Sequence, residues 1–235
     1  MKVIPAIDLM EGQVVRLFKG DPKQKTVYSN NPVEVAKKWE SDGADILHIV
    51  DLDATLGLGS NLEIIKKMSN AVSIPVEIAG GLRSKSVILD VVNSCQRIVV
   101  GTLAFKDKKL LQKLLGTLGS DRIVISVDHK DGDIVIHGWQ DNAGVDLIDA
   151  INEFLKMGFT EFLLTNVSRD GTMMGPDLKF LEQACNLGGA NVIASGGISN
   201  LKDVEDVKTK SPFGVILGKA LYENKISIKE AKTIS

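Results

Sequence analysis

The chain has 235 residues, of which 44% are hydrophobic and 25% charged, and its formal net charge is −2. This balance is typical of a globular protein and argues against nucleic acid or an anionic membrane as a partner. The two cysteines lie in expected helices without metal-ligand spacing, so we expect neither a disulfide framework nor a metal site. The sequence opens directly on a strand pattern, with no signal segment or membrane-spanning run, and we expect a cytoplasmic protein.

Short apolar runs rich in β-branched residues predict eight strands. They lie at Val3–Asp8, Ile46–Asp51, Val76–Ala79, Ile98–Gly101, Ile123–Asp128, Phe162–Asn166, Val192–Ser195 and Gly214–Leu217. Amphipathic segments between them predict helices at Pro32–Ser41, Ser60–Met68, Ser84–Val92, Asp107–Leu118, Gly144–Met157, Asp177–Leu187 and Leu201–Val207. Alternating strands and helices indicate a parallel sheet with crossover helices. We therefore expect one α/β domain over residues 1–235, a closed (βα)8 TIM barrel, with an open doubly wound sheet as the alternative.

An internal repeat favours the closed barrel. Features of the first half recur in the same order and at nearly constant spacing in the second half. The matching residues are Asp8 with Asp128, Gly59 with Gly175, Gly80-Gly81 with Gly196-Gly197, and Gly101 with Gly218. Two (βα)4 halves that face each other close a barrel, whereas an open sheet gives no reason for a twofold repeat. We place the half-barrels at about residues 1–120 and 121–235.

The repeated glycines predict two phosphate sites. Each set follows an expected strand and precedes an expected helix, where glycine permits close backbone approach and the helix N-terminus favours an anion. Barrels of this kind often bind phosphate after strands seven and eight. Two such sets across one barrel mouth predict a small-molecule substrate with a phosphate at each end, although a single glycine pair also fits a tight turn. Thr102 and Lys219 follow the second glycines and are candidates for side-chain contacts, a solvated surface lysine being the alternative for Lys219.

Asp8 and Asp128 are the candidate catalytic residues. Both end apolar strands and should face each other at the end of the barrel where active sites occur. Two carboxylates in one site suit paired acid and base work when their surroundings separate their pKa values. A capping or turn role is the alternative for either aspartate alone.

Polar residues at other strand ends add further candidates. The segment from Thr165 to Thr172, which includes Asp170 and Gly171, follows the sixth strand and could bind hydroxyls or amides, or simply form a turn. Its counterpart in the first half is the segment that holds His48 and Asp51, where a core histidine is an equal alternative. Trp139 is placed in a loop at the barrel mouth, where it could stack on a planar ring or only pack. Dinucleotide, Walker and serine-nucleophile motifs are absent, so no cofactor is expected.

Taken together, these motifs resemble the ProFAR isomerase family of histidine biosynthesis, from residue 2 to about residue 222. The resemblance is carried by Ile4-Pro5-Ala6-Ile7-Asp8-Leu9, Val15-Arg16-Leu17, Gly20-Asp21, the run His48 to Asp53, Gly80-Gly81-Leu82-Arg83-Ser84, Gly138-Trp139, the run Ser168 to Thr172, and Gly175-Pro176. The sister family, the cyclase subunit of imidazole glycerol phosphate synthase, shares the barrel and both aspartates. It usually has Cys-Leu-Asp in its first strand and a lysine-rich first loop, so the isomerase fits better. Ala143 departs from the Ser or Thr that the family pattern suggests there.

The resemblance implies an Amadori rearrangement of an aminoaldose to an aminoketose. Asp128 would be the general acid, Asp8 the general base, and Thr165 an assisting group near the reacting ribose. Arg83, Trp139 and Asp170 would contact the substrate, and the two glycine sets would hold its phosphates. A bifunctional isomerase that also acts on phosphoribosyl anthranilate, the cyclase, and a non-catalytic phosphate-binding barrel remain alternatives. We expect a monomer, and expect the segments Leu17–Asn31 and Val167–Gly175 to be mobile and to close over substrate.

Overall fold

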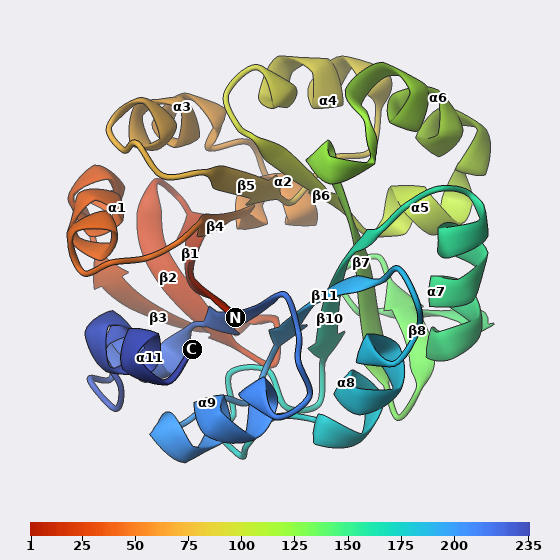
Figure 1. Cartoon of the computed structure of the whole chain (residues 1–235). Helices are drawn as coiled ribbons and strands as arrows, with labels where there is room; N and C mark the ends of the chain where they lie inside the picture. Colours follow the sequence, from red (N-terminus) through yellow and green to blue (C-terminus); the bar gives the residue numbers. More distant parts are fainter.

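The computed structural model describes all 235 residues and shows a closed ring of eight parallel strands surrounded by helices (Figure 1). The barrel strands are β1 (Lys2–Met10), β4 (Leu47–Asp51), β5 (Val76–Ala79), β6 (Arg97–Val100), β7 (Ile123–Lys130), β10 (Glu161–Asn166), β11 (Asn191–Ser195) and β12 (Gly214–Leu217). Each pairs in parallel with the next, and β12 with β1 and β7 with β10 complete the ring. The predicted (βα)8 barrel is confirmed.

The helices lie outside the ring, and most of them follow a residue whose side chain caps a free N–H group of the first turn. They are α1 (Pro32–Ser41), α2 (Leu52–Leu56), α3 (Leu62–Asn70), α4 (Lys85–Val92), α5 (Thr102–Lys106), α6 (Lys108–Leu118), α7 (Leu147–Lys156), α8 (Leu178–Cys185), α9 (Leu201–Lys208), α10 (Lys219–Tyr222) and α11 (Ile228–Ile234), with a 3-10 turn at Ser120–Arg122. Asn31, Ser84 and Asp177 each accept a bond from a backbone N–H in the first turn of α1, α4 and α8. None of these helices is long and apolar enough to cross a membrane.

Two hydrophobic cores follow from the inward and outward faces of the strands. The larger core of 49 buried residues lies between the sheet and the helices. A second core of eight residues fills the barrel itself. Its members come from inward positions of the strands and, for Ile46, from the residue before β4, namely Ile4, Ala6, Ile46, Val99, Val124, Leu163, Ile193 and Ile216. The barrel is therefore a packed layer that supports a site at its C-terminal end.

The strand register defines which residues of the two halves correspond. Asp8 pairs with Val50 on β4, and Asp128 pairs with Thr165 on β10. Val50 is thus the structural counterpart of Thr165, and Leu163 is that of His48. The two halves therefore differ in polarity at both of these positions. The first half has His48 and Val50, and the second half has Leu163 and Thr165.

Two antiparallel hairpins, which the sequence analysis did not predict, extend the strands that carry the aspartates. β2 (Gln13–Phe18) and β3 (Asp21–Ser29) follow β1, and β8 (Asp133–Ile136) and β9 (Asp141–Asp146) follow β7. The segment Leu17–Asn31, expected to be a loop, is therefore largely β-structure.

The helix expected to begin at Gly144 begins instead at Leu147. Gly144 has a φ of +71° within β9, and the Asp146 side chain accepts bonds from backbone N–H groups of the first helical turn. The glycine conformation and the cap together exclude residues 144–146 from α7.

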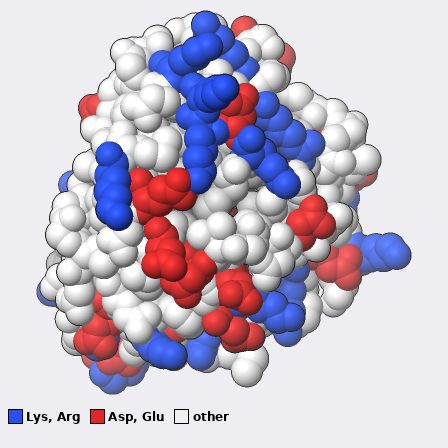
Figure 2. Space-filling view, turned by 90° about the vertical axis from the view of Figure 1, so that its right-hand side faces the viewer, with Lys and Arg blue, Asp and Glu red and all other residues white.

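The molecular surface carries charges of both signs. Figure 2 shows basic and acidic side chains interspersed over one face, with the basic ones densest along its upper edge. This distribution agrees with the formal net charge of −2.

His129 gives the fold a predicted dependence on pH. Its ring is fully buried against Phe180, its Nε2 has no hydrogen-bond partner, and burial lowers its pKa. The folded chain thus keeps this ring neutral, while the unfolded chain takes up a proton near pH 6.5. We expect His129 to reduce the free energy of unfolding as pH falls below about 6.5, with a slope of up to about 1.4 kcal/mol per pH unit.

Urea unfolding from pH 5 to pH 8 measures this slope. The variant His129→Gln should lose it, whereas His137→Gln, on an exposed part of the second hairpin, should keep it. An unchanged slope in His129→Gln would mean that other groups cause the acid sensitivity.

Candidate active site

A cavity of about 240 Å³ opens at the C-terminal ends of the barrel strands. Most of the predicted site residues line it, namely Asp8, His48, Gly80, Gly81, Arg83, Gly101, Thr102, Asp128, Trp139, Thr165 and Asp170. An adjoining smaller pocket is lined by the remaining predicted glycines, Gly171, Gly196, Gly197 and Gly218, and by Lys219. Arg16 and Asp170 line both cavities. Residues from both halves of the chain thus meet in one concave site.

Asp8 forms a buried ion pair with Arg16. The hairpin that follows β1 brings Arg16 Nη1 to 2.9 Å from Asp8 Oδ2, and both side chains are nearly enclosed. Burial raises the pKa of Asp8, while the charge of Arg16 acts in the opposite direction. Arg16 therefore favours the ionised form of Asp8 inside a site that otherwise disfavours charge.

Arg16 is a site residue that the sequence analysis quoted in a motif but did not assign. A Cβ atom at Gly218 would lie 2.2 Å from Arg16 Nη2, so the glycine makes room for the guanidinium. Arg16 thus connects the cavity that holds Asp8 with the pocket around Gly218. A charged residue at an inward position of β2, in an otherwise apolar strand, is the signal that could have identified it.

Asp128 has neutral hydrogen-bond donors in place of a cation. Ser126 Oγ donates to Asp128 Oδ1 at 2.9 Å, and Trp139 Nε1 donates to Oδ2 at 2.8 Å. Burial raises the pKa of Asp128, and the bonds from Trp139, Ser126 and Thr165 oppose that rise. The two aspartates therefore stand in different environments, one ion-paired and one bonded to neutral groups.

Trp139 has a role that the sequence did not predict. Its indole N–H is bonded to Asp128, and its ring lies so close to Gly20 that a Cβ there would come within 2.8 Å. The first hairpin thus packs against the indole at the cavity mouth. The expected stacking on a planar ring remains a prediction.

Asp170 brings a third carboxyl group to the cavity. Burial raises its pKa, Arg16 opposes that rise, and the nearby charges of Asp8 and Asp128 add to it. Asp8 and Asp170 therefore lie near the same guanidinium, and their like charges oppose each other's ionisation.

The paired glycines fit tightly against the backbone of neighbouring strand ends. A Cβ at Gly80 would lie 2.3 Å from the carbonyl oxygen of Asp51, and one at Gly197 would lie 2.1 Å from that of Gly175. Gly80 and Gly197 also have φ values of +99° and +85°, which other residues rarely adopt. The helices α4 and α9 begin shortly after these glycine pairs. Both glycine pairs therefore have the geometry of an anion cradle.

Asp51 lies outside both cavities and supports the loop beneath one cradle. Its carboxylate accepts bonds from Ser60 Oγ, from the backbone and side-chain nitrogens of Asn61, and from the N–H of Ala54 in the first turn of α2. In the second half Asn166 Nδ2 donates to Asp177 Oδ2 at 2.6 Å. Both halves thus have a hydrogen bond between an acid and an amide. The strand end carries the acid in the first half, Asp51, and the amide in the second half, Asn166.

The remaining candidates lie at the cavity rim. Arg83 donates from Nη2 to the carbonyl oxygen of Thr55, and Thr102 Oγ1 accepts a bond from the N–H of His137 at 2.9 Å. Lys219 Nζ lies 3.4 Å from the carbonyl oxygen of Gly171. Arg83 and Thr102 line the larger cavity with the first-half glycines, and Lys219 lines the smaller pocket with the second-half glycines.

The family model described as "Histidine biosynthesis protein" matches residues 2–227, nearly the whole chain. The chain belongs to this family. Among its relatives, a protein of Nitrosopumilus maritimus is 66% identical, covering 100% of this chain and 99% of the relative. A protein of Cenarchaeum symbiosum is 56% identical (98% and 99% covered), and one of Thermus thermophilus is 38% identical (98% of each chain). All three are named 1-(5-phosphoribosyl)-5-((5-phosphoribosylamino)methylideneamino)imidazole-4-carboxamide isomerase.

The fit of Gly197 against Gly175 leads to a prediction for this family member. Gly197→Ala should displace the backbone of the second cradle and raise the KM for a phosphorylated substrate at least about tenfold, because a single lost charge-assisted bond costs about 1.5–3 kcal/mol. Steady-state kinetics measure this effect. Gly116→Ala is the matched control, since a Cβ there meets nothing within 4 Å in the middle of α6. It should keep KM and raise stability by up to about 1 kcal/mol. Equal KM values for the two variants would argue against the cradle.

Proposed function

We propose that the chain is an intramolecular oxidoreductase, an aldose–ketose isomerase. It converts the bisphosphate aminoaldose ProFAR to the aminoketose PRFAR in histidine biosynthesis. The carrying observation is that Asp8 and Asp128 face one cavity, each in a different electrostatic environment, between two glycine cradles. The name shared by the relatives supports this substrate, because a compound with two phosphoribosyl groups supplies a phosphate for each cradle.

The different environments of the two aspartates support the assignment of Asp128 as the proton donor and Asp8 as the proton acceptor. Burial raises the pKa of both aspartates, but only Asp8 has a cation, Arg16, in contact with its carboxylate. We therefore assign Asp128 as the protonated acid that donates to the ring oxygen of the reacting ribose. The C1–O bond then breaks, and the nitrogen lone pair completes a protonated Schiff base. Asp8, whose ionised form the contact with Arg16 favours, removes the proton from C2. The electrons of the C2–H bond form the C1–C2 double bond of an enolamine, which takes a proton at C1 and loses the C2 hydroxyl proton to give the ketose.

The other predicted residues act on binding in this scheme. Thr165, beside Asp128, assists at the reacting ribose, and Arg83, Trp139 and Asp170 contact the substrate around it. One cradle, formed by the second-half glycines and Lys219, holds one phosphate, and the first-half glycines with Thr102 hold the other. No step requires a cofactor or a metal ion.

An assay of the purified chain on ProFAR tests the proposal. We expect conversion to the aminoketose without ammonia and without a second protein. The cyclase alternative would instead require ammonia and the aminoketose as substrate. Significant turnover of phosphoribosyl anthranilate would replace the monofunctional assignment with a bifunctional isomerase that uses the same acid and base. Lack of turnover on every one of these substrates would leave the non-catalytic alternative.

We also propose that the protein is a monomeric, cytoplasmic enzyme. It binds a small-molecule substrate and has neither nucleic acid nor a membrane as a partner. Each half supplies one aspartate and one cradle, so a single chain completes the site. The free thiols of Cys95 and Cys185 suit a reducing compartment. Sedimentation equilibrium should give the mass of one chain, 25.4 kDa.

A further inference from the structure

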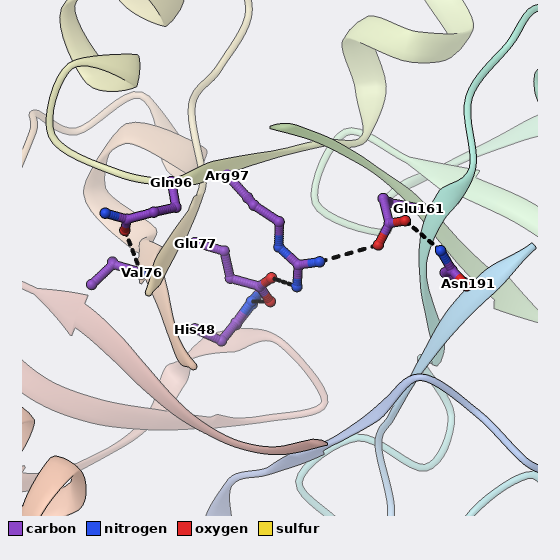
Figure 3. Close-up of polar contacts among 7 residues, drawn as sticks. All are labelled: His48, Val76, Glu77, Gln96, Arg97, Glu161 and Asn191. Carbon is purple, nitrogen blue, oxygen red and sulfur yellow. Dashed lines mark hydrogen bonds and ion pairs between the residues drawn. The ribbon is translucent and has the colours of Figure 1, made fainter. Parts of the chain in front are cut away.

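A chain of polar side chains, buried except at its last member, crosses the barrel below the cavity (Figure 3). His48 Nδ1 lies 2.7 Å from Glu77 Oε1, and Arg97 Nη2 lies 2.5 Å from Glu77 Oε2. Arg97 Nη1 then reaches Glu161 Oε2 at 3.1 Å, and Asn191 Nδ2 donates to Glu161 Oε1 at 2.7 Å. The chain therefore begins at a residue that lines the cavity and ends at the opposite rim of the barrel.

Glu77 determines which nitrogen of His48 carries a proton. Its side chain is fully buried, and burial alone would raise its pKa, but the bond and charge of His48 and the charge of Arg97 lower it. An ionised carboxylate only accepts hydrogen bonds, so His48 Nδ1 must be the donor. His48 Nε2 has no partner within the protein, and the residue lines the cavity. Glu77 thus leaves Nε2 free for a ligand.

His48 also lies close to the reacting groups. It lines the same cavity as Asp8 and Asp128, and it pairs in the β-ladder with Ala6, two residues before Asp8. The strand register places Leu163 at the equivalent position of the second half, so the repeat does not require a polar residue here. Only the first half has a histidine at this inward position, and this histidine is the end of the network that lines the cavity. This asymmetry favours a role at the site over a role in closing the barrel.

We propose that Glu77 is a positioning residue for the reaction. It fixes the ring orientation and the Nδ1-protonated form of His48, so that Nε2 meets a hydroxyl group of the reacting sugar between Asp8 and Asp128. Arg97 keeps Glu77 ionised and in place. This positioning role rests on the proposed function of the cavity. The presence of a proton on His48 Nδ1 does not depend on that function.

The variant Glu77→Gln tests the role. An amide of the same shape can donate to Nδ1 and so reverse the ring tautomer while the geometry is kept. We expect kcat for ProFAR to fall about 10- to 100-fold, as for other residues that orient a site histidine, with KM within about threefold. The matched control is Glu161→Gln, which makes the same change on the other side of Arg97 and does not touch His48. Its kcat should stay within about threefold.

Nitrogen NMR of the imidazole supplies a readout that stability does not affect. In the unmodified chain with histidine labelled by ¹⁵N, the proton of the His48 ring should be found on Nδ1, and in Glu77→Gln it should move to Nε2. Glu161→Gln should give the unmodified spectrum. Equal losses of kcat in the two variants, or an Nδ1 without a proton in the unmodified chain, would overturn the proposal.

The two proposals fail in distinguishable ways. If the unmodified chain does not turn over ProFAR, the function is wrong, while the spectrum still decides the role of Glu77 toward His48. If Glu77→Gln does not fold, the spectrum of the unmodified chain and the kinetics of Glu77→Asp decide whether Glu77 positions His48. The shorter carboxylate keeps the acceptor, so Glu77→Asp should retain the Nδ1 proton and most of kcat. A neutral Nδ1 without a proton in either protein would contradict the inference.

Discussion

Replacing Asp8 with asparagine is expected to lower kcat on ProFAR by about 10²–10⁴-fold, the contribution of a positioned general base. An amide cannot accept the C2 proton at neutral pH, while the shape of the side chain is kept. Substrate affinity should change little, because the two phosphates are held by the glycine cradles. Steady-state kinetics and titration calorimetry of the same preparation separate these two effects.

The Asp8 substitution also leaves Arg16 as a buried cation without its partner. Breaking a buried ion pair costs about 3–5 kcal/mol, so the melting temperature should fall and kcat must be measured where circular dichroism shows a folded chain. Asp149→Asn, an exposed change in α7, is the matched control and should keep kcat. Residual activity of Asp8→Asn within tenfold of the unmodified chain would exclude Asp8 as the base.

Replacing Asp128 with asparagine is expected to lower kcat by a similar factor of about 10²–10⁴, but for the opposite reason. The acid must be protonated to open the ribose ring, so the rate should fall as pH rises through the pKa of Asp128, which burial raises. This alkaline limb should be absent from the residual activity of Asp128→Asn. A pH profile of kcat measures it.

Trp139→Phe provides the companion test for Asp128. It removes the hydrogen bond that most strongly opposes the burial-induced rise in the pKa of Asp128. The alkaline limb of the profile should therefore move to higher pH, while Asp128 stays in place. A limb that moves to lower pH, or does not move, would contradict the assignment of Asp128 as the acid.

The repeat and the strand ends could be predicted from the sequence because both depend on local patterns. An apolar run that ends in an acid identified Asp8 and Asp128, and the repeated glycines located the sites expected for phosphate. The structure places these residues around adjoining cavities. Their roles remain predictions until the variants are measured.

The two hairpins explain most of what the sequence analysis missed. Arg16 meets Asp8 because β2 folds back on β1 through the turn Glu11-Gly12, and both turn residues have positive φ values. A glycine in a two-residue turn is the local signal that could have identified this hairpin. Trp139 meets Asp128 through a second hairpin of the same type. Asp51 shows why a polar residue at a strand end gave only a possible site residue, since its carboxylate binds the backbone and side chain of Asn61.

The most direct test of the account is a crystal structure of Asp128→Asn with ProFAR bound. We expect one phosphate at Gly80-Gly81 and Gly101, the other at Gly196-Gly197 and Gly218, and C2 of the reacting ribose within contact of Asp8. A complex with only one phosphate in the barrel mouth, or with the reacting ribose away from Asp8, would contradict it.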